Sequence, residues 1–257
     1  MCLVIPAYNE EKRISHTLGM ISESLLRRYG RMKVIVAVQG SDRTMDIVKG
    51  LSRKNSRIVP LDCRGTSGKG INLIRGFGAA LAARPEIVGF ADADASVHPG
   101  QLEKMIEALR SDDVQGVIAS RYVSGSKIVG HMPMSRWVAS RGYNLMVRLL
   151  FGLGFSDTQC GAKFFRASAL RSIMKKVNLT EMSFDVNLLY EMKMQNLPVE
   201  EVPITYYVKN EGSKVRVGRQ IPKMFVVTLS YRITRSPFGM LFPVWFRSAV
   251  YRWVKSW

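Results

Sequence analysis

Short apolar segments alternate with helical patterns along the first half of the chain. Patterns typical of buried strands occur at Leu3–Ile5, Val34–Val38, Ile58–Leu61, Ile87–Ala91 and Val114–Ala119. Helical periodicities lie between them, near Glu11–Arg28, Thr44–Ser52, Gly70–Ala83 and Pro99–Arg110. This alternation predicts an α/β fold built on a doubly wound, mostly parallel sheet. At 257 residues the chain is long enough to bury such a core.

Polar residues follow three of the predicted strands, in the turns PAYNE, QGSDRT and DADAS. Ligands of doubly wound sheets bind at the carboxyl ends of the strands, so these turns form the candidate site. In the third turn Asp92 and Asp94 follow a buried strand, where two unpaired carboxylates repel each other and are poorly solvated. A hard divalent cation, Mg²⁺ or Mn²⁺, would relieve both charges and keep positions for a diphosphate. We therefore predict a metal site at Asp92 and Asp94, with Ser96 as a further ligand directly or through water.

A glycine-rich stretch, RGTSGKG (Arg64–Gly70), precedes the third predicted helix. Its backbone N–H groups and the side chain of Lys69 could lie close to a phosphate. The stretch lacks the GxxxxGK[ST] pattern of a P-loop, so an ordinary turn is the alternative. Glu10 and Glu11 could likewise do no more than place negative charge at a helix N-terminus.

Positive charge is concentrated at the C-terminal end of the chain. The net charge is +18, and residues 207–257 contain ten lysines and arginines, a single acid and three of the four tryptophans. A helical wheel separates an apolar face from a basic one: Phe246, Val250, Trp253 and Trp257 against Arg247, Arg252 and Lys255. This pattern favours a basic amphipathic helix on an anionic membrane surface. Docking of the helix on its own domain is the alternative. Binding to nucleic acid is a weaker alternative, because no recognised binding motif accompanies the charge.

Cysteine usage and hydropathy indicate where the protein works. Cys2, Cys63 and Cys160 are far apart and form no disulfide or metal-binding pattern, which is typical of a reducing compartment. No apolar run reaches the roughly 18 to 20 residues of a spanning helix, and MCLVIPAYNE lacks the regions of a signal peptide. We expect a peripheral protein on the cytoplasmic face of a membrane, with residues 1–217 as a catalytic domain and 218–257 as membrane-surface helices.

Several motifs, in order along the chain, resemble those of the inverting glycosyltransferases of family 2, which have the GT-A fold. VIPAYNE resembles the opening strand and nucleotide-binding turn, DADAS the metal motif, SRYVSGS the stretch after the next strand and SRWVASRGYN the helix with arginine and serine. DTQCGAKFF, FDVNLLYE, EVPITY and GSKVRV are similar to the polyprenyl-phosphate branch, and to dolichyl-phosphate glucosyltransferases more than to mannosyltransferases. The resemblance extends from about Leu3 to Val217.

The resemblance implies transfer of a hexose from a nucleotide sugar to a membrane polyprenyl phosphate, with inversion. It assigns the donor nucleotide to Pro6, Tyr8, Glu10, Gln39, Lys69 and Ala93. It assigns the acceptor phosphate to Arg121, Arg136, Ser140 and Lys214, and the sugar to Gln159, Lys163 and Asp185. The implied catalytic residues are Asp92, Asp94, Arg121 and Arg136. Arginines suit the task because a guanidinium binds phosphate oxygens bidentately and keeps its charge.

One departure from the family pattern affects the donor. Val38 and Gln39 stand where the family usually has two aspartates, although Gln39 can still hydrogen-bond a base edge. UDP-glucose is the favoured donor and GDP-mannose the alternative.

Two other classes of protein remain as alternatives to a glycosyltransferase. A metal-dependent nucleotidyltransferase would release pyrophosphate, and a non-catalytic nucleic-acid-binding protein would have no need of Asp92 and Asp94.

Overall fold

The computed structural model describes residues 1–111, 113–179, 181–209 and 217–235. Its strands are β1 (Cys2–Tyr8), β2 (Lys33–Gln39), β3 (Ile58–Asp62), β4 (Ile87–Ala91), β5 (Gly116–Ser120), β6 (Lys127–Val129), β7 (Ala162–Arg166), β8 (Val199–Pro203) and β9 (Thr205–Tyr207). Its helices are α1 (Ile14–Ile21) with the π-helical turn η1 (Ser22–Leu26), α2 (Thr44–Lys54), α3 (Lys69–Ala82), α4 (Pro99–Ala108), α5 (Met134–Phe151), α6 (Ala167–Ile173) with the 3-10 turn η2 (Met174–Lys176), α7 (Phe184–Met194) and α8 (Val217–Thr234). The strands and helices predicted for the first half are confirmed to within a few residues.

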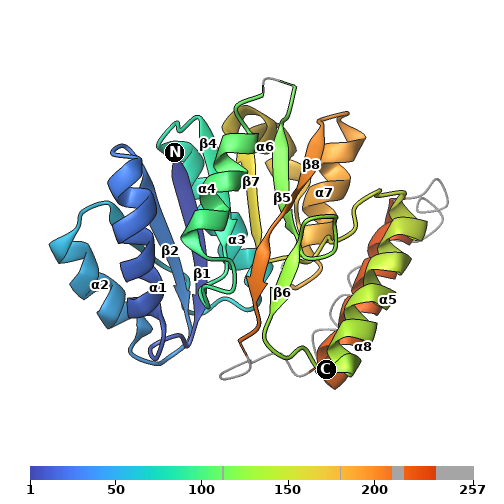
Figure 1. Cartoon of the computed structure of the whole chain (residues 1–257), viewed down its shortest axis with the longest axis horizontal. Coiled ribbons are helices and arrows are strands. Elements are labelled where there is room, and N and C mark those ends of the chain that lie inside the picture. Colours follow the sequence, from blue (N-terminus) through green and yellow to red (C-terminus); the bar gives the residue numbers. More distant parts are fainter. Residues whose placement is uncertain (112, 180, 210–216, 236–257) are drawn as a thin grey trace. The chain divides into compact units, whose positions relative to one another are not determined.

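Seven strands form one sheet in the order β3-β2-β1-β4-β7-β5-β8 (Figure 1). The pairs β1–β2, β2–β3, β1–β4 and β5–β8 are parallel, whereas β7 runs antiparallel to both β4 and β5. The predicted mostly parallel sheet is therefore confirmed. Tyr8 pairs with Gln39, so the carboxyl ends of β1 and β2 meet at one edge of the sheet. The turns PAYNE and QGSDRT follow these two ends.

Helices cover both faces of the sheet, which is why its central strands are apolar throughout. On one face α3, α6 and α7 pack against β1, β2 and β4 around the rings of Phe77, Phe90, Phe165 and Phe184. On the other face lie α1 and α4 (Figure 1). Cys2–Ile5 of β1 and all of β4 are buried between these layers. The polar turns at the strand ends are thus attached to a rigid framework.

The chain divides into two compact units. The first comprises Met1–Gly130 and Ser156–Lys209 and contains the seven-stranded sheet and the short parallel pair β6–β9. The second comprises His131–Phe155 and Asn210–Trp257. Within the residues that the structure describes, no helix combines the length and apolar character needed to cross a bilayer. The amphipathic helix predicted near Pro243–Trp257 lies outside the described residues, and the predicted boundary after residue 217 stays a prediction.

Candidate active site

The turns after β1 and β2 are joined by hydrogen bonds. Asn9, with a positive φ of 53°, accepts the backbone N–H groups of Ser41 and Asp42 on its Oδ1, at 2.9 and 3.3 Å. Gly40 has a φ of 104°, and a Cβ there would overlap the Asn9 side chain, so the close approach requires glycine. The N–H of Glu10 donates to Thr44 Oγ1 at 2.7 Å. These bonds make one polar surface from two turns far apart in sequence.

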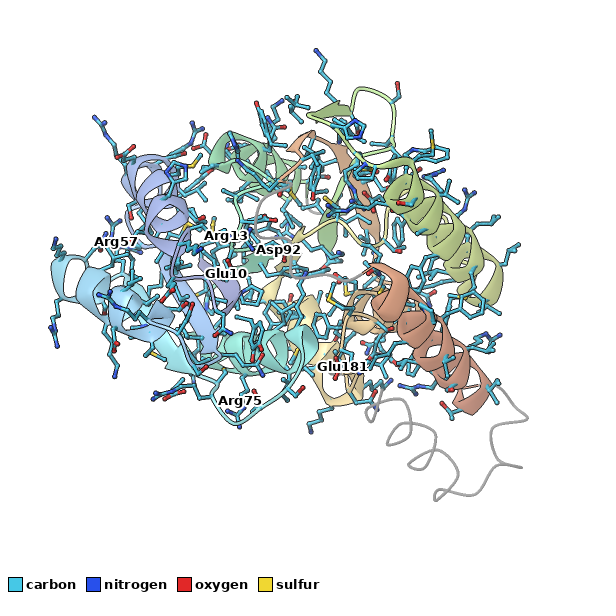
Figure 2. The ribbon with its side chains drawn as sticks, turned by 90° about the horizontal axis from the view of Figure 1, so that it is seen from below. Glu10, Arg13, Arg57, Arg75, Asp92 and Glu181 are labelled. Atoms are coloured by element: carbon cyan, nitrogen blue, oxygen red, sulfur yellow. The ribbon has the colours of Figure 1, made fainter. Side chains whose placement is uncertain are left out.

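Glu10 and Arg13 form a two-pronged ion pair beside this surface, with Arg13 Nη2 at 3.0 Å from Glu10 Oε1 and Nε against Oε2. The hydrogen bonds that Arg13 donates to Glu10 raise the pKa of Arg13, and the carboxylates of Asp94 and Asp92 add to the rise. Figure 2 shows Glu10, Arg13 and Asp92 near one another. The site therefore has a permanent guanidinium next to the predicted metal residues.

The DADAS turn is held from several sides. Asp92 donates its N–H to the carbonyl of Gly161 at 2.8 Å, and Thr17 Oγ1 donates to the carbonyl of Ala93 at 2.7 Å. Oδ1 of Asp94 accepts the N–H of Ser96 at 2.9 Å. A Cβ at Gly161 would overlap the carboxylate of Asp92. The position of Asp92 thus depends on a glycine in the loop before β7.

The two aspartates differ in their electrostatic surroundings. Lys69, the first residue of α3, places Nζ 2.7 Å from Asp92 Oδ1 with only 16% of its side chain exposed. Burial alone would lower the pKa of Lys69, but the carboxylates of Asp92 and Asp185 raise it. Burial and the negative charge of Asp92 raise the pKa of Asp94. Asp92 therefore has a counter-charge within the protein, whereas ionised Asp94 remains poorly compensated.

These residues fit a divalent cation. Carboxylate oxygens are the ligands that Mg²⁺ and Mn²⁺ prefer, and one or two from the protein suffice where a substrate diphosphate supplies others. Ser96 Oγ is buried and has no hydrogen-bond partner within the described part of the chain, which leaves it available as a further oxygen. In that same part no cluster of three or more acidic, histidine or cysteine side chains forms a closed metal site. The arrangement is an open site in which ligand positions stay available.

Other residues predicted for the donor nucleotide lie along the same edge. Pro6 is inside β1, opposite Ala37 of β2, and Tyr8 at the end of β1 is half exposed. Gln39 is buried, donates from Nε2 to the carbonyl of Thr66 and accepts from Asn72 Nδ2 at 3.2 Å. Its predicted contact to a base edge stays a prediction, because the amide already has partners in the protein.

The residues predicted for the sugar gather around β7. Lys163 is completely buried, and its Nζ lies 2.5 Å from Asp185 Oδ1 and 2.8 Å from the carbonyl of Cys160. The Nζ atoms of Lys163 and Lys69 both lie 5.3 Å from the centre of the Phe90 ring. Gln159 Nε2 is buried without a hydrogen-bond partner among the described residues. Gln159 is thus the one of the three predicted residues with a buried donor available for a ligand.

Arg121, predicted to meet the acceptor phosphate, forms a buried ion pair with Asp157. Its Nε and Nη2 lie 2.6 and 2.9 Å from the two carboxylate oxygens, and its backbone N–H donates to the same carboxylate. Tyr122 and Tyr206 place their rings 5.2 Å from the guanidinium carbon. Burial alone would raise the pKa of Asp157, but Arg121 lowers it below its usual range. Asp157 therefore already matches the charge of Arg121.

The remaining acceptor residues lie elsewhere in the chain. Arg136 and Ser140 are on α5, in the second unit, and Lys214 lies outside the described residues. The structure thus brings together residues of the first unit that were predicted for the donor and the metal, and the grouping of the predicted acceptor residues stays a prediction.

Four residues of the site were not identified from the sequence: Asn9, Arg13, Asp157 and Gly161. The spacing of Glu10 and Arg13, three residues apart at a helix start, was a signal for their ion pair. Asp157 and Gly161 both belong to the motif DTQCGAKFF, but their partners are 36 and 69 positions away in the chain. No local pattern predicts such pairs.

The fold matches solved glycosyltransferase structures. Glucosyl-3-phosphoglycerate synthase from Mycobacterium tuberculosis, solved with Mn²⁺, UDP and glucosyl-3-phosphoglycerate, superposes with a TM-score of 0.64 at 20% sequence identity, covering 90% of this chain and 78% of that one. The same enzyme with Mn²⁺, UDP-glucose and glycerol 3-phosphate gives a TM-score of 0.63, with 90% and 79% covered. At this identity the likeness concerns the fold, and it confirms the predicted GT-A architecture.

Sequence comparison gives the family. Residues 2–174 match the model of glycosyl transferase family 2, so the chain belongs to this family and is a glycosyltransferase. Glycosyltransferase AglD of Haloferax volcanii is 30% identical over 91% of this chain, which spans only 38% of that protein. Undecaprenyl-phosphate mannosyltransferase of Micrococcus luteus is 30% identical, with 84% of this chain and 86% of the relative covered. Dolichyl-phosphate beta-glucosyltransferase of Drosophila melanogaster is 28% identical, with 84% and 69% covered.

Proposed function

We propose that this enzyme transfers a hexose from a nucleotide sugar to a polyprenyl phosphate in a membrane, with inversion at the anomeric carbon. The observation that carries the proposal is the open pair of carboxylates, Asp92 and Asp94, at the carboxyl edge of the sheet, beside Arg13 and Lys69. Relatives whose names specify dolichyl-phosphate or undecaprenyl-phosphate acceptors support the choice of acceptor.

In this proposal Asp92 and Asp94, with Ser96, hold Mg²⁺ or Mn²⁺. Such a cation neutralises negative charge on the donor diphosphate, the group that leaves with the bonding electrons. Solved neighbours that contain Mn²⁺ support a divalent metal. Arg13 and Lys69 add positive charge from the protein itself. In the structure Nζ of Lys69 pairs with the carboxylate of Asp92. We expect Lys69 to turn toward the diphosphate when Asp92 binds a cation instead.

The acceptor needs positioning rather than activation. A lipid phosphate carries an anionic oxygen near neutral pH, and its direct attack on the sugar from the face opposite the diphosphate inverts the anomeric centre. Arg136, Ser140 and Lys214 remain proposed acceptor contacts. Arg121 remains one too, but its pairing with Asp157 makes Arg136 the stronger candidate. Gln159, with its unpaired buried donor, is proposed to bind a sugar hydroxyl.

UDP-glucose is the proposed donor and GDP-mannose the alternative. Relatives include glucosyl-, mannosyl- and N-acetylglucosaminyltransferases at similar identities, so they do not discriminate between donors. The proposed location is the cytoplasmic face of a membrane, with residues 218–257 on its surface. The test is incubation with radiolabelled nucleotide sugars, Mn²⁺ and polyprenyl phosphate, followed by extraction of the lipid.

We expect label in the lipid fraction from UDP-glucose, loss of that label with EDTA and loss in the Asp94→Asn variant. The matched control is Asp113→Asn, an exposed aspartate ahead of β5, at the opposite edge of the sheet. Transfer from GDP-mannose alone would support the alternative donor. No labelled lipid from any donor would contradict the proposed acceptor.

A further inference from the structure

Helix α5 exposes a row of large apolar side chains. Met134, Val138, Leu145 and Leu149 are 72, 55, 56 and 77% exposed. They recur at intervals of four, seven and four residues, and therefore lie in one stripe along the helix. Exposed apolar residues scattered singly are normal on a soluble protein, but a continuous row of them marks an interaction surface.

The opposite side of α5 is the one that packs within its own unit, against α8. Tyr143 and Thr228 share a hydrogen bond of 2.8 Å between their hydroxyls, and the rings of Phe151 and Tyr231 lie 6.0 Å apart. Arg232 Nε donates to the carbonyl of Leu150 at 2.5 Å. Helices α5 and α8 therefore pack against each other without using the exposed stripe, which is a second apolar face of α5.

The stripe is bordered by positive charge. Arg141 and Arg148 lie along it with Trp137, and together with Val138 and Leu145 they line a shallow hollow of about 340 Å³. His131–Phe155 and residues 222–235 contain six lysines and arginines and neither aspartate nor glutamate. On α8, Phe225, Leu229 and Ile233 are exposed as well. These described parts of the second unit thus combine exposed apolar side chains with charged residues that are all positive.

We propose that the stripe Met134–Leu149 of α5 lies in the headgroup region of an anionic lipid bilayer. Burial of the four apolar side chains among acyl chains removes their contact with water, and Arg141 and Arg148 meet lipid phosphates. Trp137 has an apolar body and a polar N–H, which suits the same depth. A nucleic acid would match the charge but would leave the apolar row in water. The inference rests on the proposed function and deepens it, because an acceptor that stays in the bilayer requires the enzyme to dock on the membrane surface.

The test compares variants of the full chain in binding to vesicles of phosphatidylcholine, with and without phosphatidylglycerol. Leu145→Gln with Leu149→Gln removes apolar surface at exposed helical positions, where glutamine is a good helix former. We expect binding to both kinds of vesicle to weaken at least about tenfold, since each buried leucine contributes more than this when fully transferred. The matched control is Met194→Gln, an exposed apolar residue at the end of α7 in the first unit, which should bind as the wild type does.

A second variant tests the contribution of the positive charges separately from that of the apolar side chains. Arg141→Gln with Arg148→Gln should weaken binding by about thirtyfold on vesicles with phosphatidylglycerol, because each charge contributes roughly 1 kcal/mol near an anionic surface. Binding to pure phosphatidylcholine should barely change. If the leucine variant binds vesicles as tightly as the wild type, the proposal is wrong.

Other occupants of the stripe give different results. If another segment of the chain covers the stripe, the leucine variant should have a lower melting temperature and unchanged vesicle binding. If a second copy of the chain covers it, the wild type should be a dimer in sedimentation and the leucine variant should dissociate. Either result overturns the proposal. Calorimetric binding of UDP-glucose with Mn²⁺ should be equal in all variants. If the wild type binds no UDP-glucose but the variants differ in vesicle binding as expected, the result would count against the proposed function and not against the membrane surface on α5.

Discussion

Asp92 and Asp94 share a turn but not a counter-charge. Lys69 lies against Asp92, whereas burial and Asp92 itself raise the pKa of Asp94. Because the charged form of Asp94 is the less compensated of the two, a bound cation stabilises it more. Of the two proposed metal ligands, Asp94 is thus the one whose charged form a bound cation would stabilise more.

Asp94→Asn tests this view. The substitution should lower the affinity for Mn²⁺ at least about tenfold, since loss of a ligand costs no less than loss of a supporting residue. It should leave the melting temperature in EDTA unchanged or raised, because it removes a buried charge. Calorimetric titration and thermal unfolding measure the two effects. An unchanged Mn²⁺ affinity, with Asp113→Asn as control, would mean that Asp94 is not a ligand.

At the scale of elements, the site depends on contacts between β4 and the segment that leads into β7. The sequence predicted β4 and the aspartates after it, because an apolar run ending in DADAS is a local pattern. It did not predict the placement of β7 between β4 and β5, since antiparallel pairing of Phe90 with Lys163 is set by residues far apart in the chain. The Arg121–Asp157 pair was missed for the same reason.

Gly161→Ala tests the contact between these elements. The added Cβ would overlap the Asp92 carboxylate, so Asp92 has to move away from Lys69 and from the metal position. We expect transfer activity and Mn²⁺ affinity to fall at least about tenfold. Gly154→Ala is the matched control, because a Cβ there meets no atom within 4 Å. Equal activity of the two variants would show that Asp92 tolerates displacement.

Asp157→Asn tests the buried ion pair. Loss of the carboxylate leaves Arg121 buried without its counter-charge, and the free energy of unfolding should fall by about 3–5 kcal/mol near neutral pH. Since the pKa of Asp157 is lowered in the folded state, its stabilisation is complete above the unfolded pKa and is lost as the pH falls through the folded one. Urea denaturation of both proteins at about pH 7 and about pH 3 should therefore show the difference shrinking in acid. A difference that stays constant would rule out this role of the pair.

For the whole molecule, the charge distribution is as informative as the fold. Much of the net charge of +18 belongs to the second unit, in which His131–Phe155 and residues 222–235 contain six lysines and arginines and residues 236–257, outside the described part of the chain, contain three more. Composition alone predicted the anionic partner. It did not predict α5 as part of the surface, because the arginines of SRWVASRGYN resemble acceptor residues and the apolar stripe is evident only once the buried side of the helix is known.

Deletion of Phe242–Trp257 tests the terminal segment. We expect weaker binding to anionic liposomes and slower transfer to long-chain polyprenyl phosphate, while nucleotide binding stays near normal because Asp92 and Asp94 lie in the turn after β4, in the first unit. Salt should weaken liposome binding of the full chain without abolishing it, since apolar burial is not screened. Complete co-sedimentation of the truncated protein, or its unfolding, would favour a helix docked on its own domain.

The central claim is transfer of the sugar itself from a nucleotide to a lipid phosphate. Its most direct test is quantification of both products of one reaction with UDP-glucose, Mn²⁺ and polyprenyl phosphate, by chromatography of the nucleotide and NMR of the lipid-linked sugar. The account predicts equal amounts of UDP and of lipid-linked glucose, with the anomeric configuration inverted relative to the donor. Release of pyrophosphate, or a lipid-linked sugar with the donor's configuration, would contradict it.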